Sequence, residues 1–326
     1  MRLAKSEVIG LSLVSSTSDG NPEVALATPQ ADCPCLLDAL AVYLEHKGKG
    51  RPKTFRLAAE RSCKYVIGLC GNKPLSQYTR QDALQFRDWL VARGLTGSSI
   101  TRNFSYLKAV INFALSEYAL DVRNPFVGVY HDRSAGVLTR KPIPIEVIRT
   151  VQSECRTIDD DMRWLIAIIS DSGMRLAEGA GLLKSDLILG SSIPYISLKP
   201  HPWRRLKTAS SQRDIPLVGA SLWAAQRLSE AFPDSPYAFP RYNRKNTTKS
   251  NSASAALNKW LHQYVPGGCT MHSFRHSMRD RLRAVECPSD VIDQIGGWAT
   301  EGVGQGYGEG YELKVCAKWM RLVAQK

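Results

Sequence analysis

The spacing of apolar residues in the first third of the chain is the feature that most constrains the fold. Over residues 98–118 apolar side chains recur three or four positions apart, which places them on one face of an α-helix. Shorter stretches before it follow the same rule, and one begins at Thr79, with Asp82 at the spacing of a helix cap. The pair Ser98-Ser99 is expected to cap the last helix. We therefore expect the first part of the chain to be a compact bundle of four or five helices.

The rest of the chain follows a different pattern. Residues 131–144 are polar and contain Gly and Pro, which is typical of a linker. Beyond them a helix is expected near residues 161–171, then two short strands within 192–198 and 213–218, then further helices. The sequence thus predicts a mainly α fold with a small β-sheet. Its expected parts are a flexible arm over 1–31, a helical domain over 32–130, a linker over 131–144 and a second domain over 145–326.

The excess of positive charge is the first indication of function. The chain carries 43 Lys and Arg against 30 Asp and Glu, a net charge of +13, divided as +5 over residues 1–130 and +8 over 131–326. Two basic domains suit a partner rich in phosphate. The sequence contains no run of about 18 apolar residues, so no membrane-spanning helix is predicted. The N-terminal stretch resembles a signal peptide only poorly. We therefore expect a cytoplasmic protein without a membrane partner.

Metal binding and disulfides are not expected. The 8 cysteines include no CxxC pair, which argues against a zinc ribbon and favours reduced thiols. The three acids at 159–161 are expected to begin a helix, where negative charge is favourable, rather than to hold a metal ion.

Charged and polar residues of the second domain gather near its expected structural breaks. Arg175 and Glu178 stand three positions apart, as do His272 and Arg275, so each pair can share a helical face. Taken alone, such pairs are more often solvated. The full set, in chain order, is Arg175, Glu178, Lys207, His272, Arg275, His276, Trp298 and Tyr307.

In their order and spacing these residues resemble the motifs of the tyrosine recombinase, or phage-integrase, family. The motifs are SGMRLAE, KTxxSxRxIPL, HSFRH and GGW, followed by a tyrosine. One match would be weak, but five in order are specific. The resemblance implies a helical core-binding (SAM-like) domain followed by an α+β tyrosine-recombinase catalytic domain.

The same resemblance implies a role for each residue. Tyr307 would attack the scissile phosphorus and form a 3′-phosphotyrosyl intermediate, with Tyr311 as the alternative nucleophile. Arg175 and Arg275 would bind the non-bridging phosphate oxygens. The remaining roles are acid/base assistance by His272, proton donation to the leaving oxygen by Lys207, a hydrogen bond from Trp298, and support of these groups by Glu178 and His276.

The implied function is that of a site-specific DNA recombinase that needs neither metal nor ATP. Its partners would be double-stranded DNA, a homo-oligomer that forms a tetramer on synapsed DNA, and DNA-bending accessory proteins. It would lie in the cytoplasm and on the nucleoid. Two alternatives stay open, a non-catalytic DNA-binding relative and a type IB topoisomerase-like nicking-closing enzyme. The candidate DNA contacts are Arg102, Lys108, Arg204, Arg205, Arg241, Arg244 and Lys245.

The C-terminal residues 312–326 also predict a helix. Its apolar face could pack on its own domain or dock on a neighbouring subunit, and the pattern does not decide between the two.

Overall fold

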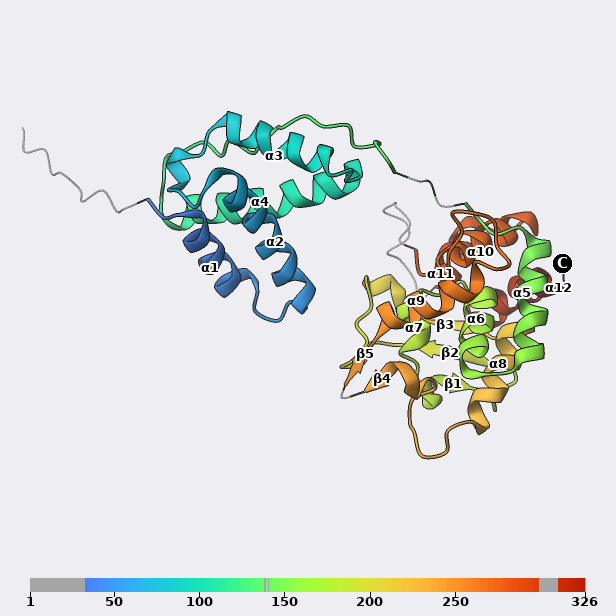
Figure 1. Cartoon of the computed structure of the whole chain (residues 1–326). Coiled ribbons are helices and arrows are strands. Elements are labelled where there is room, and N and C mark those ends of the chain that lie inside the picture. The colour runs from blue at the N-terminus through green and yellow to red at the C-terminus, as the bar shows by residue number, and fades with distance from the viewer. Residues whose placement is uncertain (1–32, 138, 140, 245, 299–309, 326) are drawn as a thin grey trace, which may run out of the picture. The chain divides into compact units, whose positions relative to one another are not determined.

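The computed structural model describes residues 33–137, 139, 141–244, 246–298 and 310–325 (Figure 1). The chain divides into two compact units between Val137 and Leu138. The expected arm over 1–31 lies outside the described residues. The described part is mainly helical with two small sheets, which confirms the expected fold class. None of its helices is both long enough and apolar enough to cross a bilayer.

The first unit is a helical bundle in which α4 contacts each of the other three helices (Figure 1). Its core is aromatic, because the rings of Phe86, Phe104 and Phe126 lie within 6.5 Å of one another. All three side chains are buried. The helices are α1 (Leu36–Lys47), α2 (Lys53–Cys70), α3 (Arg80–Ala92) and α4 (Gly97–Glu117).

The start of α3 is the one that the sequence predicts. Thr79 Oγ1 accepts a hydrogen bond from the Asp82 N–H, and the Asp82 carboxylate accepts one from the Thr79 N–H at 2.7 Å. The cap of α4 differs from the prediction, since it is Thr96 rather than Ser98-Ser99. The Gly97 N–H donates to the Ala135 carbonyl at 2.8 Å. This hydrogen bond holds Gly97 against the segment that follows α4, and the helix therefore begins earlier than predicted.

The segment expected as a linker, 131–144, is packed at both of its ends. The His131 ring stacks on Phe104 in the first unit, with ring centroids 6.0 Å apart. At the other end Ile143 is buried in the second unit, and its N–H donates to Ser277 Oγ at 2.7 Å. The segment is polar in composition, yet its first residue packs on the first unit and its Ile143 packs in the second.

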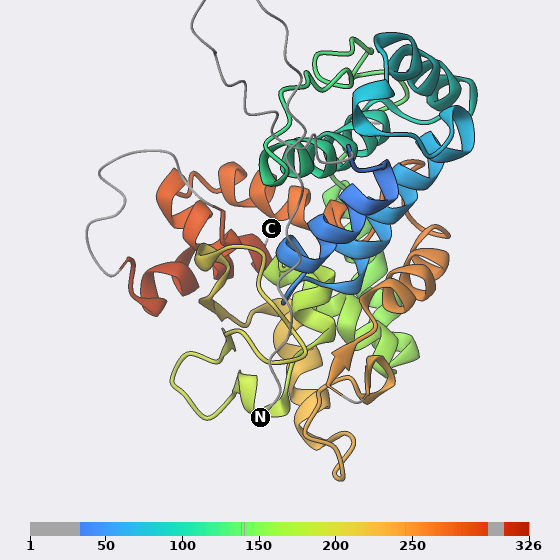
Figure 2. The same ribbon diagram turned by 90° about the vertical axis from the view of Figure 1, so that its left-hand side faces the viewer.

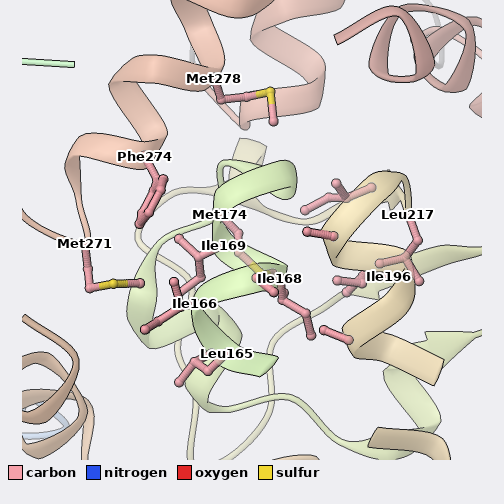
Figure 3. Packing of buried hydrophobic residues seen from close by; sticks show 14 of the residues in the cluster. Leu165, Ile166, Ile168, Ile169, Met174, Ile196, Leu217, Met271, Phe274 and Met278 are labelled. Atoms are coloured by element: carbon pink, nitrogen blue, oxygen red, sulfur yellow. The ribbon is translucent and has the colours of Figure 1, made fainter. Parts of the chain in front are cut away.

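The second unit is built around α6 (Asp161–Ser172), whose Leu165, Ile166, Ile168 and Ile169 are all fully buried. A helix that is apolar on all sides needs cover on all sides. Figure 3 shows these side chains between Met271 and Phe274 on one side and Ile196 and Leu217 on the other. The other helices of this unit are α5 (Ile145–Ile158), α7 (Leu176–Ala180), α8 (Gly219–Glu230), α9 (Ser250–Leu261), α10 (Ser273–Ala284), α11 (Ser289–Gly296) and α12 (Leu313–Gln325).

A three-stranded antiparallel sheet of order β1-β2-β3 completes the second unit. Its register places Ile196 opposite Ile215 and Leu198 opposite Arg213. The two expected strands are β2 and β3, and α11 and α12 lie against β3 (Figure 2). The other strands contain two residues each, too few for an alternating pattern to reveal. The strands are β1 (Leu187–Ile188), β2 (Tyr195–Leu198), β3 (Arg213–Pro216), β4 (Asn243–Arg244) and β5 (Thr247–Thr248).

The C-terminal helix α12 packs on its own unit. Cys316, Met320 and Val323 are buried in the core of that unit. The guanidinium of Arg281 on α10 donates to the Val323 carbonyl at 3.2 Å and ties the helix down. Of the two arrangements that the sequence left open, the structure therefore shows α12 packed on its own unit.

This packing predicts that Met320→Ala destabilises the protein by about 2–5 kcal/mol, because the side chain is fully buried and its loss leaves a cavity. Leu322→Ala is the matched control on the same helix, since Leu322 is 38% exposed and should change stability by about 0.5 kcal/mol or less. Urea unfolding followed by circular dichroism measures both. Equal losses in the two variants would contradict a buried α12.

Candidate active site

Arg175 and Glu178 form the first part of the site. Arg175 precedes α7, and the Glu178 carboxylate accepts a hydrogen bond from the Arg175 backbone N–H at 2.9 Å. The same carboxylate accepts one from Arg175 Nη1 at 2.6 Å. Glu178 is only 3% exposed. The pair is thus a helix cap and a buried ion pair, and not a solvated pair on a helical face.

Arg213 is a second partner of Glu178, and it was not among the residues proposed from the sequence. Its Nη2 lies 3.5 Å from Glu178 Oε2. Its other nitrogens donate to the carbonyls of Ile295 and Ser211, each at 2.7 Å. Burial lowers the pKa of Arg213 to about 10. The signal in the sequence was the alternation of Arg213 with the apolar Ile215, which places both side chains on one face of the strand.

Arg275 brings a third guanidinium to the site from α10. The residue is 4% exposed, and its Nη1 donates to the Gly173 carbonyl at 2.9 Å. Burial, followed by the charges of Arg175 and Arg213, lowers the pKa of Arg275 to about 9. The side chain therefore stays charged at neutral pH. Among the described residues, its buried Nη2 finds no hydrogen-bond partner.

Trp298 lies against this arginine. The Arg275 guanidinium carbon is 4.3 Å from the centre of the indole, and that of Arg279 is 5.0 Å away. Gly296 is required beneath the ring, since a Cβ there would collide with the indole. Gly297 has φ +61°, and a side chain there would also meet Arg213. The two glycines of the GGW motif are therefore needed because α11, Trp298 and Arg213 pack closely together.

His272 and His276 lie at the start of α10. His272 directly precedes the helix and is partly buried, whereas His276 is exposed, and their ring centroids are 5.3 Å apart. Together with Arg275 and Trp298 they line a pocket of about 250 Å³. The described residues contain no group of three His, Cys, Asp or Glu side chains that could hold a metal ion. Asp160, in the acidic run, caps α6.

Lys207 lies on the loop between β2 and β3 and is exposed. The loop is linked to the arginines through Ser211, whose hydroxyl accepts a hydrogen bond from Arg175 Nη1 at 2.9 Å. The Thr208 hydroxyl lies 2.9 Å from the same Ser211 oxygen. The loop that carries Lys207 therefore closes beside the arginine cluster.

Tyr307 lies outside the described residues, but the alternative nucleophile Tyr311 does not. The Tyr311 hydroxyl donates to Asp290 Oδ2 at 2.9 Å. This hydrogen bond and the negative charge of Asp290 raise the pKa of Tyr311. The phenolate, which is the nucleophilic form, is therefore disfavoured at Tyr311.

The candidate DNA contacts lie in different environments. Arg204 is 2% exposed and donates to the Asp186 carboxylate and to two backbone carbonyls, so its assignment as a phosphate contact is corrected to a buried structural role. Arg241 pairs with Asp161 through two hydrogen bonds, which raises its pKa. Lys245 lies outside the described residues. The exposed candidates are Arg102, Arg205, Arg241 and Arg244, and Lys108 is half-buried.

The arrangement has a clear electrostatic consequence. Three guanidiniums, from Arg175, Arg213 and Arg275, surround one buried carboxylate, so the cluster carries an excess of positive charge. Arginine forks match the geometry of phosphate oxygens. Fixed cations of this kind also stabilise negative charge that develops on a phosphate in a transition state. The cluster is thus suited to hold a phosphodiester.

Comparisons with known proteins identify the family and the fold. The model of the family described as "Phage integrase family" matches residues 145–309. A DNA-bound structure of the Tn1549 transposon integrase (its residues 82–397) superimposes with a TM-score of 0.65 at 17% identity, covering 88% of this chain and 99% of that one. A lambda integrase tetramer bound to a Holliday junction gives a TM-score of 0.63 at 12% identity, covering 87% of this chain and 82% of that one. No curated protein matches the chain in sequence.

The buried carboxylate leads to a prediction. Glu178→Gln should destabilise the protein by about 3 kcal/mol, because Arg213 would lose its counter-charge while still buried. Millimolar sulfate should raise the melting temperature of this variant more than that of the unaltered protein, since an anion can replace the lost charge. Thermal unfolding measures both effects.

The matched control for this prediction is Glu60→Gln, which removes a carboxylate paired with the exposed Arg56. This surface pair should contribute less than about 1 kcal/mol. If Glu178→Gln melted at the same temperature as Glu60→Gln, the carboxylate would not hold the arginines together.

Proposed function

Since this chain belongs to the phage integrase family, we propose that it is a site-specific DNA recombinase that cleaves and rejoins strands through a 3′-phosphotyrosyl intermediate. The observation that carries the proposal is the cluster of Arg175, Arg213 and Arg275 beside the buried Glu178. A surface-binding domain has no need to bury two guanidiniums, those of Arg213 and Arg275, next to a third that is partly exposed. A phosphodiester reaction does, because negative charge grows on the phosphate as the nucleophile attacks.

Phosphate binding is the first step of the proposed mechanism. The buried Nη2 of Arg275 is available to a non-bridging oxygen, and Arg175 is 22% exposed in its side chain while Glu178 holds it in place. Trp298, stacked on Arg275, supplies an indole N–H as one further donor. Arg213 lies deeper and orients Glu178, so we assign it a supporting part.

Tyr307 is the proposed nucleophile. A tyrosine has an ordinary pKa near 10, so its ionisation at pH 7 costs about 4 kcal/mol. Fixed cations and a proton acceptor reduce this cost, and His272 is the proposed acid/base group. Trp298 and Gly310 line one pocket of about 450 Å³ together with Arg213.

The leaving 5′ oxygen needs a proton, and Lys207 on the β2–β3 loop is the proposed donor. The bond from Tyr307 Oη to phosphorus forms as the bond to the 5′ oxygen breaks, and the Lys207 ammonium protonates that oxygen. Religation reverses both changes. The cations supply the charge that a metal would otherwise bring, and the sequence has no GxxxxGK[ST] loop for ATP.

The proposed partner is double-stranded DNA. The net charge of +13 favours binding to phosphate with a marked salt dependence. The Tn1549 and lambda integrase structures contain DNA, and one lambda structure is a tetramer on a Holliday junction. By analogy we propose a tetramer on synapsed DNA, helped by DNA-bending accessory proteins, in the cytoplasm and on the nucleoid. Exposed Arg102 on α4 and Arg244 on β4 are the proposed phosphate contacts, with Lys108, Arg205 and Lys245.

The test of this proposal uses a nicked suicide DNA substrate that carries the cognate site and traps the covalent intermediate. Tyr307→Phe should bind the site but form no covalent adduct, because the phenol oxygen that attacks phosphorus is absent. Tyr311→Phe should keep adduct formation within about threefold of the unaltered protein. Denaturing gels measure the adduct and filter binding measures affinity.

Two results would overturn the assignment. An adduct that persists in Tyr307→Phe and is lost in Tyr311→Phe would move the nucleophile to Tyr311. Absence of an adduct with the intact chain on its cognate site would favour a non-catalytic DNA-binding protein on this fold.

A further inference from the structure

We propose that Arg204 is a positioning residue for Lys207: it fixes one end of the loop that brings the proton donor to the arginine cluster. The inference rests on the proposed function and concerns a residue that does not touch DNA. It follows from the way the chain between β2 and β3 is anchored.

The anchor at the first end of the loop is a tight turn followed by a buried ion pair. His201 and Arg204 exchange backbone hydrogen bonds in both directions, each at 3.0 Å, around Pro202 and Trp203. Arg204 Nη2 donates to Asp186 Oδ2 at 3.3 Å and to the Lys199 carbonyl at 2.6 Å. Asp186 is fully buried and also contacts His201 Nε2 at 3.0 Å.

This turn is attached to the helix that carries Glu178. Arg204 Nη1 donates to the Glu178 carbonyl at 3.2 Å, and the Trp203 indole N–H donates to the Gly181 carbonyl at 3.2 Å. The fit is close, because a Cβ on Gly181 would lie 2.9 Å from Arg204 Cδ. The Trp203 ring is in turn stacked on His201, with ring centroids 4.8 Å apart.

The second end of the loop is fixed on the same structure. Ser211 is fully buried, and its hydroxyl accepts a hydrogen bond from Arg175 Nη1, which Glu178 also holds. Between the two anchors only residues 205–210 remain, with Lys207 third among them. Without Arg204 the residue that directly precedes this span would lose its side-chain anchor, leaving only those of His201 and Trp203, and a longer unanchored loop samples more positions. A proton donor works only when it is held close to the atom it protonates.

The experiment compares two leaving groups on the same nicked DNA. In one substrate the scissile linkage has its natural 5′ oxygen, and in the other a sulfur atom replaces that oxygen. An alkoxide leaves poorly without a proton, since an alcohol is a very weak acid. A thiolate leaves readily, because a thiol has a pKa near 8.5. A defect in proton donation therefore slows the oxygen substrate alone.

For Arg204→Met we expect cleavage of the oxygen substrate to slow by about 10- to 100-fold at saturating DNA. Cleavage of the sulfur substrate should stay within about threefold of the unaltered protein. Lys207→Ala should show the same pattern to a larger degree. Arg227→Met is the matched control, because it removes an arginine of α8 that pairs with Asp159, and it should cleave both substrates at the unaltered rate.

A milder variant guards against loss of the fold. Trp203→Phe keeps an aromatic ring beside His201 but removes the N–H that donates to Gly181. We expect it to slow the oxygen substrate by about three- to tenfold, again with a normal rate on sulfur, and to retain the melting temperature within a few degrees.

The outcomes separate the inference from its premise. If the unaltered protein cleaves neither substrate, the proposed function fails. If Lys207→Ala cleaves the oxygen substrate normally, the premise that Lys207 donates the proton fails. If both reactions behave as proposed but Arg204→Met and Trp203→Phe slow the two substrates equally, or slow neither, then Arg204 does not position Lys207 and the inference is wrong.

Discussion

The buried carboxylate of Glu178 is the interaction on which the rest of the site depends. It caps α7, pairs with the partly exposed Arg175 and lies beside Arg213, which is buried on β3. One side chain thus joins the start of a helix to two arginines. Buried guanidiniums repel one another, and the pKa of Arg275 falls to about 9 because of burial and its neighbours' charge. A single fixed carboxylate lets these charges stay together while leaving the cluster positive. That excess is what an incoming phosphodiester would neutralise.

The scaffold around this carboxylate is apolar and closely packed. The helix α6, buried on all sides, leads directly to Gly173, whose carbonyl accepts the Arg275 hydrogen bond. A Cβ on Gly173 would collide with Met278. The core thereby sets the distance between α6 and α10, and with it the place of Arg275. Close packing explains why a site made of long, flexible arginines can be held in one geometry.

The two ends of the loop between β2 and β3 are each held by polar contacts, and these contacts extend the fixed geometry of the core to the surface. Ser211 is tied to Arg175, and Arg204 is tied to Asp186 and to the Glu178 carbonyl. Lys207 lies between them on an exposed loop. The same loop therefore holds an exposed lysine between two fixed ends, which suits the proton donor that we propose Lys207 to be.

The sequence by itself determined the helical first unit and the order of the motifs, because helical periodicity and short motifs are local properties of the chain. The roles of the site residues stay predictions. It also indicated the Thr79 cap and the two main strands. Only the tertiary structure decided that Arg204 is buried, that Arg213 reaches Glu178 and that α12 packs on its own unit. These facts depend on residues far apart in the chain. Arg204 was predicted to contact phosphate, but the structure shows its guanidinium beside the buried Asp186, 18 residues earlier in the chain.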